Sequence, residues 1–139
     1  MAKTSAAKAA RAHLRKKALA YPEAFEDFPW GDAVYKVRGK IFLFLGVDAD
    51  GLGVTTKLPD TNGIALMLPN VAPTGYGLGR SGWVSATFGV AEVPPLKMLD
   101  AWIDESYRAV APARLVKKLD APAAAEPPRR RPRRRQSRR

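Results

Sequence analysis

The hydrophobic residues of this chain recur with two different periods, and the first is that of a helix. Residues 4–20 are rich in alanine and contain neither glycine nor proline. Thr4 or Ser5 can cap the start of a helix, and Pro22 would stop it. We therefore predict a helix over residues 4–20, whose thin apolar face carries Ala10, Leu14, Ala18 and Tyr21.

The period changes to two at Tyr35, where apolar and polar residues alternate as in a strand with one buried face. Arg38 and Gly39 predict a tight turn. The run 41–45 that follows is apolar at every position, which is typical of a central strand or one covered on both faces. A turn at 48–51 then leads into a third strand, with Leu52, Val54 and Thr56 on one face. We predict that the three strands form an antiparallel meander.

The next segment is expected to contain a short helix, a loop and a strand. Pro59 suits the first turn of a helix running to about Leu68, with Ile64, Met67 and Leu68 facing inward. Residues 72–82 hold four glycines and predict a loop. Residues 83–90 alternate again, and one face of this strand would carry Val84, Ala86, Phe88 and Val90.

The clearest helix of the chain is predicted after Pro94 and Pro95. Apolar residues recur there at spacings of three and four, which is the pattern of an amphipathic helix: Leu96, Leu99, Trp102, Ile103, Tyr107 and Val110. Pro112 would begin a last short helix with Leu115, Val116 and Leu119 inward. The mixed order of helices and strands predicts an α+β domain, a two-layer sandwich of an antiparallel sheet with helices packed mainly on one face.

Charge divides the chain into a nearly neutral centre and two basic ends. The chain has 24 Lys and Arg against 13 Asp and Glu, a formal net charge of +11. Residues 1–17 hold six bases and no acid, and residues 127–139 hold eight arginines and no acid, so the centre is slightly negative. We expect residues 1–120 to form the domain, and residues 121–139 to form a disordered Pro/Ala linker and a basic tail.

Several classes of site and location are disfavoured by composition. The chain has no cysteine and only one histidine, so it offers no disulfide, no thiolate ligand and no multi-histidine metal site. It has no apolar run long enough to span a membrane and no secretory signal, so we expect a cytoplasmic protein. Ser106 lacks an evident base, and no pair of acids suggests a catalytic dyad. We therefore expect a protein without enzymatic activity, metal or cofactor.

Four short motifs, in this order, make residues 15–119 resemble the small bacterial proteins of the MmcQ/YjbR family. They are YP at 21–22, PWGDAVYKVRGKIFLFLG at 29–46, PTGYGLGRSGWVSATF at 73–88 and WIDESYRAVAP at 102–112. The positions that match the family's pattern are Tyr21, Pro22, Trp30, Gly31, Val37, Gly39, Lys40, Phe42, Pro73, Gly75, Tyr76, Arg80, Trp83, Ser106 and Tyr107. Many relatives have a histidine where this chain has Gly82, and the arginine tail lies outside the common core.

The resemblance implies both a fold and a function. The fold is the two-layer sandwich of the CyaY/secretion-chaperone-like class, in the order α-β-β-β-α-β-β-α. This order requires one more strand than the patterns above, and we place it in or beside residues 75–79. Family members are usually labelled DNA-binding, so the resemblance implies nucleic acid as the partner and favours DNA over RNA.

Candidate phosphate contacts occur in three places. The tail contributes Arg129, Arg130, Arg131, Arg133, Arg134 and Arg135, and clustered arginines bind phosphates without reading sequence. Lys36, Arg38 and Lys40 could form a β-wing along a DNA backbone, with Lys36 and Arg38 on one strand face, or they could be ordinary solvated residues. Tyr76 and Arg80 on the glycine loop, with Trp83 beside it, suit a single strand, although packing is the simpler role for Trp83.

Two functions of different classes remain open at this stage. The first is a nucleic-acid-binding protein in which the arginine tail and the basic N-terminal helix supply most of the affinity. The folded domain adds a modest surface around Lys36, Arg38, Lys40 and Arg80. The second is a protein-interaction or chaperone-like module, or a homodimer, in which the tail is incidental. The exposed face of the sheet discriminates between them, because apolar residues there favour a protein partner and bases favour phosphate.

Overall fold

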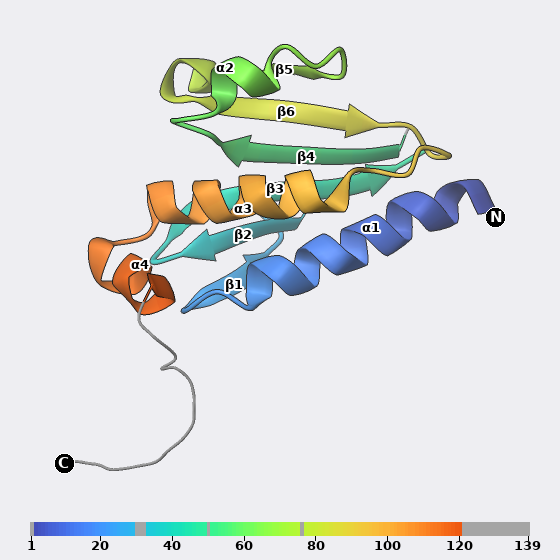
Figure 1. Cartoon of the computed structure of the whole chain (residues 1–139). Helices are drawn as coiled ribbons and strands as arrows, with labels where there is room; N and C mark the ends of the chain where they lie inside the picture. The colour runs from blue at the N-terminus through green and yellow to red at the C-terminus, as the bar shows by residue number, and fades with distance from the viewer. Residues whose placement is uncertain (1, 30–32, 50, 76, 121–139) are drawn as a thin grey trace.

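A six-stranded antiparallel sheet with helices on one face makes up the described part of the chain (Figure 1). The computed structural model describes residues 2–29, 33–49, 51–75 and 77–120. The sheet order is β1-β2-β3-β4-β6-β5. The elements, with η1 a 3-10 helix, are α1 (Ala2–Leu19), β1 (Ala24–Asp27), β2 (Ala33–Val37), β3 (Lys40–Asp48), β4 (Gly51–Lys57), α2 (Asn62–Ala65), β5 (Val71–Pro73), η1 (Leu78–Ser81), β6 (Trp83–Phe88), α3 (Leu96–Val110) and α4 (Ala113–Asp120).

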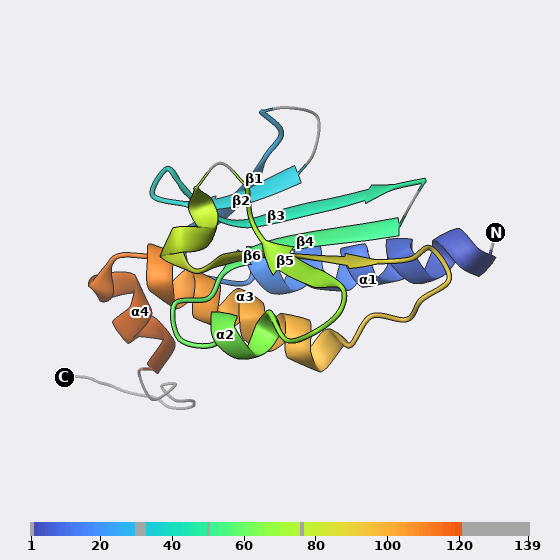
Figure 2. The same ribbon diagram turned by 90° about the horizontal axis from the view of Figure 1, so that it is seen from above.

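Helices α1 and α3 cover the same face of the sheet, so the predicted two-layer α+β sandwich is confirmed (Figures 1 and 2). The core lies between the two layers. It joins the buried stripes of both helices to the inward residues of the central strands, among them Leu14, Ala18, Leu43, Leu45, Leu52, Val54, Leu99 and Ile103. We call the opposite side of the sheet the outer face.

The long helices and the meander are confirmed, because their burial follows the period of the sequence. In α1, Ala10, Leu14, Ala18 and the following Tyr21 are all buried. In α3, the stripe through Leu99, Trp102, Ile103 and Tyr107 is buried. Strands β2, β3 and β4 pair antiparallel in succession.

The extra strand implied by the family resemblance is β5, which lies beside residues 75–79 as expected, and the loop after it contains η1. Two features differ from the sequence prediction. The helix expected over 59–68 is only the single turn α2, and it buries Ala65 while Ile64 is 73% and Met67 is 82% exposed. Strand β1 was not predicted, because it is a short edge strand with no buried residue.

A β-bulge in β3 decides which side chains reach the core. Tyr35 pairs with Leu43 but Lys36 pairs with Ile41, so Phe42 is an extra residue between two ladder pairs. Phe42 and Leu43 are both fully buried. The Phe42 ring lies 5.2 Å from the Tyr107 ring, edge to face. The apolar run 41–45 therefore places more side chains in the core than strict alternation would.

Ser106 satisfies the backbone that the bulge leaves unpaired. Its hydroxyl donates to the carbonyl of Phe42 at 2.5 Å and accepts from the N–H of Lys57 at 2.9 Å. The side chain is fully buried, so neither backbone group has water as a substitute partner. This serine thus fixes α3 to both β3 and β4.

We predict that Ser106→Ala lowers the free energy of unfolding by about 1–3 kcal/mol, because it leaves a buried donor and a buried acceptor unpaired. Urea unfolding followed by circular dichroism measures the change. Ser81→Ala, at an exposed serine of η1, is the matched control and should change stability by less than about 0.5 kcal/mol. Equal effects of the two substitutions would contradict the role given to Ser106.

Candidate nucleic-acid interface

The predicted basic hairpin is largely neutralised by its neighbouring strand. Lys36 Nζ lies 2.8 Å from Asp27 Oδ2, and Arg38 Nε lies 2.5 Å from Glu23 Oε1. The expectation that Lys36 and Arg38 share a strand face is wrong, because Arg38 sits in the turn with φ +53°. Lys40 is exposed and has no acidic partner among the described residues. One of the three hairpin charges is therefore left for an external anion.

Strand β1 supplies the acids that cause this neutralisation. The register pairs Ala24 with Val37, which brings Glu23 next to Arg38 at the end of the ladder. Glu26, on the helix side, accepts hydrogen bonds from Arg15 at 2.8 Å and from the Tyr35 hydroxyl at 2.6 Å. The Arg15 hydrogen bond holds the pKa of Glu26 below its usual value. Burial, and then the hydrogen bond to Glu26, raises the pKa of Tyr35.

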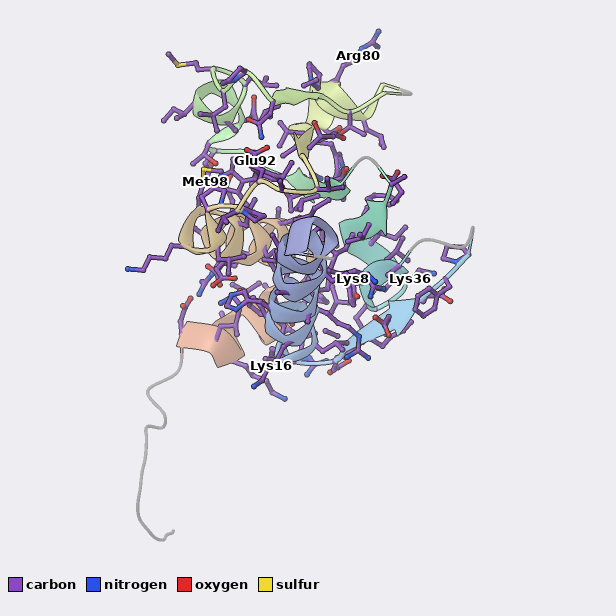
Figure 3. The ribbon with its side chains drawn as sticks, turned by 90° about the vertical axis from the view of Figure 1, so that its right-hand side faces the viewer. Lys8, Lys16, Lys36, Arg80, Glu92 and Met98 are labelled. Atoms are coloured by element: carbon purple, nitrogen blue, oxygen red, sulfur yellow. The ribbon has the colours of Figure 1, made fainter. Side chains whose placement is uncertain are left out.

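The remaining predicted contacts do not join the hairpin. Arg80 is exposed on η1, far from Lys36 at the other side of the sheet (Figure 3). Trp83 is only 8% exposed, and its ring packs edge to face against Phe44 at 5.7 Å, so it offers little surface for base stacking. Tyr76 lies outside the described residues, as does the predicted disordered segment with its Arg129, Arg130, Arg131, Arg133, Arg134 and Arg135.

Other exposed bases lie in the last turns of α1 and α4. Lys16 lies in the last turn of α1, and Lys117 and Lys118 lie in the last turn of α4. All three are exposed and have no acidic partner in the described ranges. Arg114 of α4 reaches Glu23, just after α1, at 3.5 Å, and Figures 1 and 3 place α4 near this end of α1. We call Lys16, Lys117 and Lys118 the basic helix end.

The sequence indicated Lys16 through the basic N-terminal helix, whereas Lys117 and Lys118 were not singled out. Each helix ends in a Lys-Lys pair, Lys16-Lys17 and Lys117-Lys118. Such pairs also interact favourably with the negative end of the helix dipole, which is reason enough for their presence. Lys17 has a further structural role, since its amine lies over the Tyr21 ring at 5.1 Å. Only the tertiary structure shows that α4, through Arg114 in its first turn, lies near the end of α1.

The outer face of the sheet mixes large apolar residues with polar ones, the latter including Asp27, Thr55, Ser85 and Thr87. The register places Phe25, Val34, Ile41, Phe44 and Trp83 on it, with Lys36 and Lys57 as its bases. A hollow of about 390 Å³ lies over the cross-strand pair Gly46 and Gly53, between Phe44 and Thr87. A Cβ on Gly53 would meet no atom within 4 Å. Glycine inside a strand often marks a place where another molecule approaches closely.

Gly82, which replaces the histidine of many relatives, has a conformation that favours glycine. Its φ is +91°, and a Cβ there would lie 3.0 Å from the carbonyl oxygen of Leu58. The Leu58 N–H donates to the Gly82 carbonyl at 2.8 Å, which holds β6 close to the end of β4. A side chain at this position would require a shift of the backbone.

The described residues contain neither a metal-binding cluster nor a membrane-crossing helix. No group of three or more His, Cys, Asp or Glu residues in them could hold a metal ion. No helix in the same ranges is long and apolar enough to cross a membrane. Residues 1, 30–32, 50, 76 and 121–139 lie outside the described part of the chain.

Comparison with known proteins identifies the family. The sequence profile of the YjbR family matches residues 19–109, more than half of the chain. The chain belongs to the YjbR family. Among solved structures, the Deinococcus radiodurans protein DR2400, which carries a DUF419 domain, is similar to this YjbR-family chain with a TM-score of 0.59 and 24% identity, over 77% of this chain and 85% of that one. This likeness shows the fold. No curated protein matches the chain.

We predict that Glu26 contributes to the loss of stability of this YjbR-family domain in acid. Its folded pKa is lowered below the unfolded value of about 4.3, so its stabilisation is present above that value and is lost as pH falls through the folded pKa. Between about pH 6 and pH 3, Glu26→Gln should lose less stability than the unmodified chain, by up to about 1 kcal/mol because Arg15 is half exposed.

Urea unfolding at each pH measures this difference. Glu92→Gln is the matched control, because Glu92 is exposed and accepts a single backbone hydrogen bond, from Gly89. Its pH profile should follow that of the unmodified chain. Parallel profiles for Glu26→Gln and the unmodified chain would show that the Arg15–Glu26–Tyr35 group contributes nothing to acid sensitivity.

Proposed function

We propose that this YjbR-family protein is a cytoplasmic, non-enzymatic nucleic-acid-binding protein that contacts phosphates without reading sequence. The contacts come from the eight arginines of residues 127–139 and from the basic helix end. The observation that carries the proposal is that Lys16, Lys117 and Lys118 are exposed without acidic partners, at the end of the domain from which the chain continues into the arginines.

Electrostatics favours this end over the hairpin. A base already held by a carboxylate must lose that partner before it can neutralise a phosphate, as Lys36 and Arg38 would. A free lysine or arginine only releases condensed counterions from the nucleic acid, which is favourable at moderate salt. Duplex DNA is the first target to test, because it carries about one charge per 1.7 Å of helix axis.

A second candidate function is binding of a protein partner at the outer face. Its support is the hollow over Gly46 and Gly53 together with the apolar residues around it, among them the half-exposed Phe25. Apolar residues on the exposed sheet face favour a protein partner, and exposed bases favour phosphate. The outer face therefore favours an apolar partner, and the basic helix end favours phosphate. The two functions occupy different surfaces. If the chain showed no salt-dependent affinity for nucleic acid, the outer face would become the leading site.

We predict that the arginine tail dominates the salt dependence of DNA binding. Replacing all eight arginines of residues 127–139 with glutamine keeps the chain length and removes eight charges. Each phosphate contact contributes about 0.9 to the slope of log K against log salt, so the slope should fall by at least about 3. Fluorescence anisotropy with a labelled duplex of about 20 base pairs, between about 50 and 200 mM salt, measures it.

The same titration with a labelled single strand serves as the comparison for DNA form. Phosphate contacts alone predict the same ranking of variants on both ligands. An unchanged slope after the replacement would mean that the tail makes no phosphate contacts, and the proposal would lose its main support.

We predict that the basic helix end binds DNA more strongly than the hairpin does. Lys117→Gln with Lys118→Gln should weaken binding severalfold and reduce the salt slope by about 2, because two phosphate contacts are lost. Lys36→Gln with Arg38→Gln removes the same number of charges and should have a smaller effect, since both bases are already paired. A larger effect of the hairpin pair would restore the β-wing as the site.

A further inference from the structure

A groove runs between α3 and the segment that follows β4. Its volume is about 390 Å³, and Pro59 and Asp60 line one side. Asp104, Glu105 and Arg108 of α3 line the other, with the small Ala101 and Ala109 between the turns. We call it the acidic groove, because three carboxylates and one guanidinium give it a net charge of −2.

The carboxylates of the groove differ in how many hydrogen bonds they already accept. Glu105 is engaged, since it accepts hydrogen bonds from the N–H groups of Asp60 and Thr61 and from the Thr61 hydroxyl. Asp104 accepts from Tyr21 and from Arg108. The Asp60 side chain is exposed and has no basic partner among the described residues. An ionised carboxylate can accept about four hydrogen bonds, so Asp60 and Asp104 both retain capacity for a cation.

The described part of the chain ends beside this groove. Arg108, which lines it, also holds the carboxylate of Asp120 at 3.0 Å, and Asp120 is the last described residue. The chain therefore continues from the end of the groove. Residues 121–128 hold no base, and eight arginines follow from Arg129. An extended linker of this length spans up to about 26 Å, whereas Ala101 and Arg108 are about 10 Å apart along α3.

We propose that the arginine segment 129–139 docks reversibly in the acidic groove of its own chain and competes there with nucleic acid. The competition, but not the docking, rests on the function proposed above. The planar guanidinium matches carboxylate geometry, and the tether raises the local arginine concentration to the millimolar range. Exposed pairs of this kind are weak and screened by salt, so the tail exchanges between docked and free states.

A spin label in the full chain tests the docking. The chain has no cysteine, so Ser137→Cys carries a single nitroxide. We expect the amide signals of Asp60, Thr61 and Ala101 to lose more than half their intensity, while those of Gly46 and Gly53 on the outer face keep theirs. About 1 M NaCl should restore the lost signals. Uniform attenuation over the domain, or attenuation strongest outside the groove, would overturn the proposal.

Two variants and a mixing experiment separate the groove from general electrostatics. Asp60→Asn should restore most of the signals near the groove. Glu92→Gln removes the same charge before α3 begins, beyond the far end of the groove, and should restore none; recovery with this control would overturn the proposal. The spin-labelled chain is also mixed with an isotope-labelled chain that carries no nitroxide. Attenuation there would mean docking between copies and would likewise overturn it.

Addition of duplex DNA tests the competition. DNA that binds the tail should restore the groove signals as it saturates the protein. If DNA binds and the groove signals stay attenuated, the competition is wrong. If the groove signals are attenuated but no DNA binds, the docking stands, whereas the competition and the proposed function both fail.

Discussion

The hydroxyl group of Ser106 satisfies the backbone groups that the β-bulge in β3 leaves unpaired, and the rest of the domain depends on this interaction. Ser106 bonds both to the carbonyl of Phe42 and to the N–H of Lys57, so α3 has a single position relative to β3 and β4. The bulge sends the Phe42 ring inward, against the rings of Tyr21 and Tyr107. Tyr107 then donates its hydroxyl to the carbonyl of Pro22, at the end of α1. Ser106 and Tyr107 together join both long helices to the sheet.

The same local geometry determines where positive charge remains available. The tight turn after β2 brings Arg38 to the end of the ladder, and the antiparallel register of β1 puts Glu23 beside it. Asp27 reaches Lys36 on the outer face, and Glu26 reaches Arg15 under α1. Each acid of the edge strand thus holds a base of the neighbouring elements. Lys16 at the end of α1 and Lys117 and Lys118 at the end of α4 have no acidic partner among the described residues, and all three stay exposed.

The parts of the fold that could be predicted are those in which burial has a regular period. The stripe of α3 and the alternation of Leu52, Val54 and Thr56 in β4 are local and were confirmed. Strand β1 and the single turn α2 could not be predicted from their own residues. Strand β1 forms ion pairs with α1 and β2, and Thr61 at the start of α2 donates to the carboxylate of Glu105 in α3. The candidate site could be predicted only in part, for the same reason. Alternation suggested a basic wing at Lys36 and Arg38. Whether a base is free depends on the acids that the folded structure brings beside it, and the local sequence pattern does not contain this information.

A neutral domain with strongly basic ends must also avoid binding every polyanion it meets, and the acidic groove bears on this problem. A tail that is docked for part of the time presents a lower effective positive charge. A short or weakly charged anion binds the tail only after displacing it from the groove, which costs free energy. The groove carries a net charge of only −2, whereas duplex DNA offers about one charge per 1.7 Å over its whole length. Long nucleic acid would therefore displace the tail where short anions fail. Pairing between the tail and the acidic groove would convert a non-specific charge attraction into a preference for long nucleic acids with closely spaced phosphates.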